Sequence, residues 1–74
     1  MSQAAHLVKM ANQIALNLAA AGSDEEAIEL TARHIRQFWT PVMTRKLLDY
    51  AASGGEGCSP LVMRVLQERL QTQA

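Results

Sequence analysis

The sequence has only one cysteine, Cys58, so the chain cannot form an internal disulfide, and we expect a reducing, cytoplasmic environment. The sequence also has no excess of positive or negative charge. Seven Lys and Arg residues balance seven Asp and Glu residues, which argues against a general binder of polyanions. Long apolar runs are absent as well, because polar residues such as Lys9, Asn12 and Asn17 interrupt the alanine- and leucine-rich stretch near the N-terminus. We therefore expect neither a transmembrane span nor a signal peptide.

The length of 74 residues allows one domain at most, and we assign residues 1–74 to a single domain. A chain of this size buries only about 60–65% of the surface that its unfolded form exposes. Its stability margin is therefore thin, and small chains of this kind often gain stability from a partner.

Helix signals occur along the whole chain, and no stretch alternates convincingly enough to predict a strand. The first helix can be capped by Ser2 and stopped by Gly22. The stretch "SDEE" begins with a capping box formed by Ser23 and Glu26. Pairs of cap and proline, Thr40-Pro41 and Ser59-Pro60, mark two more starts. The pattern predicts an all-α bundle of four short helices near residues 3–21, 24–39, 41–53 and 60–71.

Between the third and fourth helices, the glycines of "SGGEG" favour a left-handed helix end and a loop. The last four residues, "QTQA", are expected to fray. The apolar stripes of the helices predict a core made of Leu7, Met10, Ile14, Leu18, Ile28, Ile35, Phe38, Met43, Leu47, Leu61, Val65 and Leu66.

Residues for catalysis or metal binding are poorly represented. Cys58 with His6 or His34 would make a thiolate and base, but one cysteine beside glycines is more often a small apolar residue at a helix start. Two distant histidines and one cysteine match no known ligand spacing. The loop "GGEGCSP" lacks the Lys-Ser/Thr of a phosphate-binding loop and follows no strand. We expect no catalytic residue, no metal site and no cofactor site in this chain.

The segment "HIRQFWTPVM" concentrates the only Phe, the only Trp and one of the two prolines around a helix corner. Trp39 lies one position off the apolar stripe, so either contact with a partner or partial burial fits it. Trp beside Arg is a composition enriched at interface hot spots. We predict that Arg36, Trp39, Arg45 and Lys46 form a partner-binding surface.

The same segment is locally basic, because no carboxylate occurs between Thr31 and Leu48. A solvated helix face is the ordinary explanation of such a run. A regulatory module that binds nucleic acid through the basic patch Arg33–Lys46 is the alternative function, although the tight Thr40-Pro41 corner does not resemble a helix-turn-helix.

Four stretches together carry a family resemblance: "LVKMANQIA" from Leu7, "HIRQFWTPVM" from His34, "LL" at Leu47-Leu48 and "GGEGCSPLV" from Gly54. In this order they resemble the delta subunit of bacterial NAD-dependent, molybdenum- or tungsten-containing formate dehydrogenase. The resemblance covers nearly the whole chain.

The resemblance implies a cytoplasmic, non-catalytic accessory subunit that assists assembly or stability of the holoenzyme. The partners it implies are the catalytic alpha subunit together with the beta and gamma subunits, with no nucleic acid and no membrane. Those larger subunits are expected to hold bis-molybdopterin guanine dinucleotide with Mo or W, iron–sulfur clusters, FMN and the NAD site. The delta subunit itself is expected to hold none of these, and to help alpha receive or retain its pterin cofactor.

Overall fold

The computed structural model describes residues 3–20 and 22–70, and within these residues the chain is helical without any strand. The elements in chain order are α1 (Gln3–Ala19), α2 (Asp24–Phe38), α3 (Pro41–Ala52), α4 (Pro60–Val65) and a π-helical turn, η1 (Leu66–Leu70), that continues α4. The predicted all-α fold of four helices is confirmed. The predicted cap Ser2 and the polar tail 71–74 lie outside the described residues.

Side-chain caps start three of the helices as the sequence predicts. The Ser23 hydroxyl accepts from the backbone N–H of Glu26, whose carboxylate accepts in return from the N–H of Ser23. The hydroxyls of Thr40 and Ser59 cap α3 and α4 by accepting from the backbone N–H groups of Met43 and Val62, and each cap is followed by proline in the first turn. α1 ends at Ala19, two residues before the end that Gly22 predicts.

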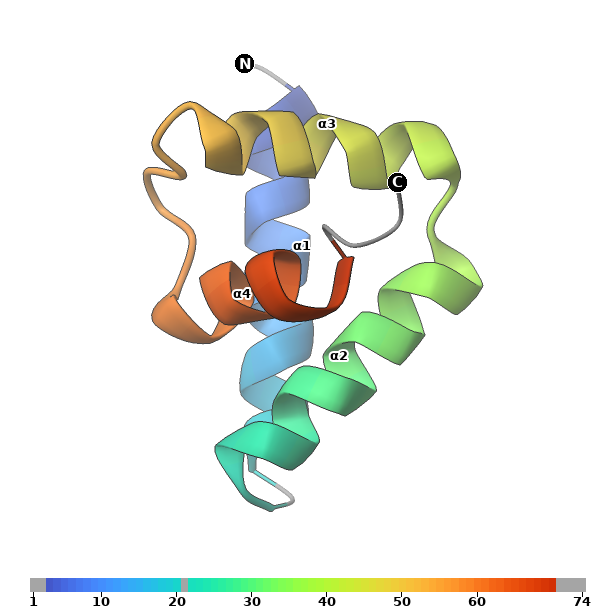
Figure 1. Ribbon diagram of the computed structural model, residues 1–74, viewed down its shortest axis with the longest axis vertical. Helices are drawn as coiled ribbons and strands as arrows, with labels where there is room; N and C mark the ends of the chain where they lie inside the picture. The colour runs from blue at the N-terminus through green and yellow to red at the C-terminus, as the bar shows by residue number, and fades with distance from the viewer. Residues whose placement is uncertain (1–2, 21, 71–74) are drawn as a thin grey trace.

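The C-terminal segment, residues 60–70, lies in front of α1 in the view of Figure 1, below α3 and beside α2. α2 returns alongside α1, and α3 lies across the end of α1 where the chain begins. α4 contacts both α1 and α2, and η1 contacts both α2 and α3. Residues 60–70 therefore hold the other three helices together and contribute much of the core.

The core contains most of the predicted residues. Leu7, Ile28, Ile35, Leu47, Val65 and Leu66 are buried, while Met10, Ile14, Met43 and Leu61 are partly buried and pack against them. Leu18 is half-buried. The prediction for Phe38 is wrong: its side chain is 67% exposed, and Trp39 is buried in its place. Val8, Val62 and Leu70 are further buried residues that the predicted core omitted.

Glycine conformation shapes the loop between α3 and α4. Gly54, Gly55 and Gly57 all have positive φ, which confirms the predicted left-handed helix end. A Cβ at Gly55 would lie 2.8 Å from the sulfur of Met63, so the end of that flexible side chain would have to move. The hydroxyl of Tyr50 donates to the carbonyl of Glu56 at 2.6 Å and ties the loop to α3.

Ion pairs fasten the C-terminal segment to α2 on the surface. Arg64 contacts Glu25 of α2 at 2.7 Å and Glu68 at 2.9 Å, and Arg69 contacts Glu29 of α2 at 3.1 Å. The hydrogen bonds to Glu68 and Glu25 raise the pKa of Arg64. These side chains are solvent-exposed, so each pair contributes little alone, and their main effect is to fix the position of η1 beside α2.

Candidate functional site

A single face of α3 is turned toward the ends of α2 and η1. Its residues Pro41, Thr44, Arg45 and Leu48 recur at steps of three and four, which places them in one row along the helix. This row lies next to the α2–α3 corner. The sequence predicts a binding role for Arg45 alone among these four residues, although their spacing already indicates one row.

A shallow hollow of about 360 Å³ lies between this row, the C-terminal end of α2 and η1. It is lined by Arg36, Trp39, Pro41, Thr44, Arg45, Leu48 and Leu70, and we call it the Arg36–Arg45 hollow. Three of the four predicted partner-binding residues thus lie together. The floor is apolar, since Trp39 and Leu70 are buried and Leu48 packs against the core.

The two arginines of the hollow differ from the other three in the chain. Arg33, Arg64 and Arg69 each pair with a glutamate. Arg36 and Arg45 are exposed and make no ion pair with any residue in 3–20 or 22–70. No carboxylate lines the hollow. The structure therefore gathers both of its unpaired guanidinium groups around one apolar floor.

Trp39 forms part of that floor and does not project from the surface. Its backbone is extended, with φ −90° and ψ 148°, and its side chain is only 7% exposed. It follows Ile35 by four residues, so it continues the buried row of α2 at the point where the helix ends. Of the two interpretations of Trp39, burial is the one that the structure shows.

Lys46 lies on another side of α3 from Arg45. Consecutive helix residues are about 100° apart around the axis, so the two side chains cannot share a face. The ammonium of Lys46 donates to the side-chain amide oxygen of Gln3 in α1. Arg33 pairs with Glu29 at 3.8 Å. The basic patch Arg33–Lys46 is thus divided among three places, and only Arg36 and Arg45 share one.

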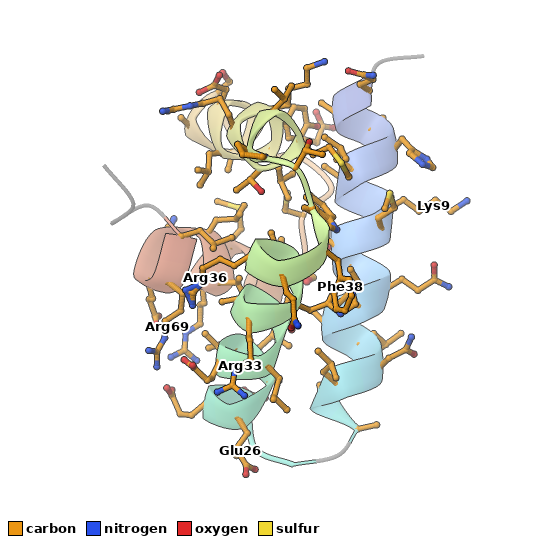
Figure 2. The ribbon with its side chains drawn as sticks, turned by 90° about the vertical axis from the view of Figure 1, so that its right-hand side faces the viewer. Lys9, Glu26, Arg33, Arg36, Phe38 and Arg69 are labelled. Atoms are coloured by element: carbon orange, nitrogen blue, oxygen red, sulfur yellow. The ribbon has the colours of Figure 1, made fainter. Side chains whose placement is uncertain are left out.

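Phe38 lies on the other side of α2 from Arg36 (Figure 2). Its ring is 4.8 Å from the imidazole of His34, one helical turn earlier, at a tilt of 44°. Val42, just beyond the corner, is 63% exposed. This apolar surface is separate from the Arg36–Arg45 hollow.

Neither a metal centre nor a membrane span is built by the described part of the chain. Within residues 3–20 and 22–70, no three His, Cys, Asp or Glu side chains gather closely enough to hold a metal ion. Cys58 is half-buried against the core, and desolvation raises the pKa of its thiol. In the same residues, no helix has the length and apolar character needed to cross a membrane.

Comparison with known proteins identifies one family. The family model described as "NADH-dependant formate dehydrogenase delta subunit FdsD" matches residues 6–66, a span that includes all four helices in whole or in part. No curated protein and no solved structure gives a significant match to the chain. The matched span contains Arg36, Trp39, Arg45 and Lys46 as well as the loop before α4. Because the match covers most of the 74 residues, this chain belongs to the family of formate dehydrogenase delta subunits.

Proposed function

We propose that this chain is a non-catalytic accessory subunit of cytoplasmic NAD-dependent formate dehydrogenase, and that it docks on the catalytic alpha subunit to stabilise the assembled enzyme. The observation that carries the proposal is the family match over residues 6–66. A subunit of this enzyme must contact at least one other subunit, and the resemblance in sequence points to alpha.

The structure supports a binding role more than a chemical one. The core of the chain is small, and the two unpaired arginines flank an apolar floor. Exposed, unpaired arginines contribute little to the stability of an isolated domain, but arginine is common where one protein contacts another. We further propose that docking helps alpha receive or retain its molybdopterin cofactor, which the alpha subunit would hold.

The proposal is tested by producing the enzyme in cells with and without this chain. Affinity-tagged alpha is purified from both, and subunit composition, metal per alpha subunit and pterin per alpha subunit are measured. We expect the chain to copurify with alpha in amounts close to one per alpha, and metal or pterin content to fall when the chain is missing.

Two results separate the parts of the proposal. If the chain does not copurify with alpha, the assignment as an accessory subunit docked on alpha is wrong. If it copurifies but metal and pterin content are unchanged without it, the cofactor role is wrong and the stabilising role is then judged from the half-life of activity on heating. Nuclease treatment before purification serves as the control, because association bridged by nucleic acid would disappear.

A further inference from the structure

The Arg36–Arg45 hollow contains the two arginines that have no carboxylate partner among the described residues. Five arginines are present, and the three outside the hollow all have a glutamate partner within the chain. The two arginines of the hollow have none among the described residues, and no carboxylate lines the space between them. Among the described residues, no anion therefore complements these two guanidinium groups.

The hollow also has an apolar floor, which a small inorganic anion would leave uncovered. Trp39 and Leu70 are 7% and 1% exposed, and Leu48 lies beside them. An occupant that satisfies both features carries a carboxylate for the guanidinium groups and an apolar side chain for the floor. Arginine suits this role because its planar fork binds a carboxylate through two parallel hydrogen bonds.

We infer that the Arg36–Arg45 hollow receives an acidic segment of the alpha subunit, with at least one Asp or Glu side chain between the two arginines and an apolar side chain on the floor of Trp39, Leu48 and Leu70. The inference rests on the proposed function for the identity of the partner. The inference adds the chemistry of the contact: a carboxylate of alpha binds Arg36 and Arg45, and Lys46 lies outside the interface.

Nucleic acid fits the hollow less well than a protein segment does. Only two cations line it, whereas binding to a phosphate backbone gains affinity from several contacts in a row. The other basic residues of the segment, Arg33 and Lys46, are engaged with Glu29 and Gln3. An acidic protein segment needs only the cations that are present.

A matched pair of double variants tests the site by charge. The double variant Arg36→Glu, Arg45→Glu reverses the charge of the hollow. Lys9→Glu with Arg33→Glu makes the same change in net charge elsewhere, on exposed side chains of α1 and α2 that Figure 2 labels. Each purified variant is titrated against formate dehydrogenase prepared without this chain, and circular dichroism verifies the fold of each. We expect the first variant to bind about tenfold or more weakly and the control to bind within about twofold of the unaltered chain.

A chemical cross-link identifies the occupant. The Arg36→Lys, Arg45→Lys variant keeps the positive charges and supplies amines, which a zero-length carbodiimide joins only to a carboxylate in direct contact. Lys9 and Lys46 are the internal controls, because both are present in this variant and neither lines the hollow. We expect amide bonds from positions 36 or 45 to an Asp or Glu of alpha, within a peptide that also contains apolar residues.

The outcomes separate this inference from the proposed function. If the unaltered chain does not bind the enzyme, both fail. If the unaltered chain binds but the Arg36→Glu, Arg45→Glu variant binds as tightly as the unaltered chain or as the control variant, the inference alone is wrong. Cross-links from positions 36 or 45 to a carboxylate of the same chain would show that the chain itself fills the hollow, and would overturn the inference. A bound Lys variant without any cross-link at these positions would do the same.

Discussion

Asn12 of α1 holds the start of α4 through Ser59, which is distant in sequence. The side-chain oxygen of Asn12 accepts from the backbone N–H of Ser59 at 2.9 Å, and its amide nitrogen donates to the carbonyl of Gly57 at 2.8 Å. One amide thus satisfies two backbone groups of the loop that precedes α4. This contact gives a physical role to Asn12 within the stretch "LVKMANQIA".

We predict that Asn12→Ala lowers the free energy of unfolding by about 1–3 kcal/mol, because the partly buried N–H of Ser59 loses its partner. Asn17→Ala is the matched control, since Asn17 is an exposed residue of the same helix. Urea unfolding followed by circular dichroism measures both. Equal unfolding midpoints for the two variants would show that the two hydrogen bonds of Asn12 do not stabilise the fold.

The neighbours Phe38 and Trp39 are predicted to differ sharply on truncation. Trp39→Ala removes a buried indole and is expected to cost about 3–5 kcal/mol, enough to unfold much of a chain with so thin a margin. Phe38→Ala removes an exposed ring and is expected to cost about 0.5 kcal/mol or less. Thermal melts of the two isolated variants measure the difference. A Trp39→Ala variant as stable as Phe38→Ala would contradict the burial of the indole.

This pair also shows how far the sequence predicts the structure. Local signals placed the helix starts correctly, because the caps at Ser23, Thr40 and Ser59 act within one turn. The row of α2 allows either Phe38 or Trp39 to point inward, since they follow Ile35 by three and four residues. The choice depends on the extended backbone at Trp39 and on packing against α3 and η1, which are distant in sequence. Local periodicity does not contain that information.

The candidate site was predictable to a similar extent. Composition drew attention to Arg36, Trp39 and Arg45, and the structure brings these three around one hollow. The sequence predicts one surface for Lys46 and Arg45 because they are neighbours, but neighbouring helix positions point in different directions. Leu70 was missed as part of the site, since only the fold places η1 beside the α2–α3 corner.

Thr31 is predicted to tolerate replacement by an isosteric apolar residue. Its side chain is fully buried in α2, and its hydroxyl has no hydrogen-bond partner among the described residues. Thr31→Val keeps the shape and removes a buried polar group, so we expect stability to stay equal or to rise by about 1 kcal/mol. Thr31→Ala is the comparison, since it leaves a cavity and is expected to destabilise. A clear loss of stability in Thr31→Val would show that the hydroxyl has a partner.

Cys58 is predicted to contribute a weak pH dependence of stability and no chemistry. Burial raises the pKa of its thiol above the ordinary 9.0, so the folded chain keeps this proton where the unfolded chain releases it. The contribution is therefore complete below pH 9.0 and is lost as pH rises through the higher pKa of the folded state. Unfolding curves at several pH values should show this alkaline loss, and Cys58→Ser should lack it.

The same Cys58→Ser variant tests the chemical role of the thiol. Because no ligand cluster for a metal forms among the described residues, we expect the variant to leave holoenzyme activity and metal content nearly unchanged. The variant must be shown to fold and to remain bound to the enzyme. A loss of metal or pterin under those conditions would show that the thiol takes part in cofactor delivery.

The central claim, that this chain docks on formate dehydrogenase as an accessory subunit, is tested most directly by native mass spectrometry of the enzyme purified through tagged alpha. The account predicts a complex whose mass includes one 8.1 kDa chain for each alpha subunit, and loss of that mass in the Arg36→Glu, Arg45→Glu variant but not in the Lys9→Glu, Arg33→Glu control. A complete, active enzyme that never contains the 8.1 kDa chain, while the chain is found free or bound to nucleic acid, would contradict it.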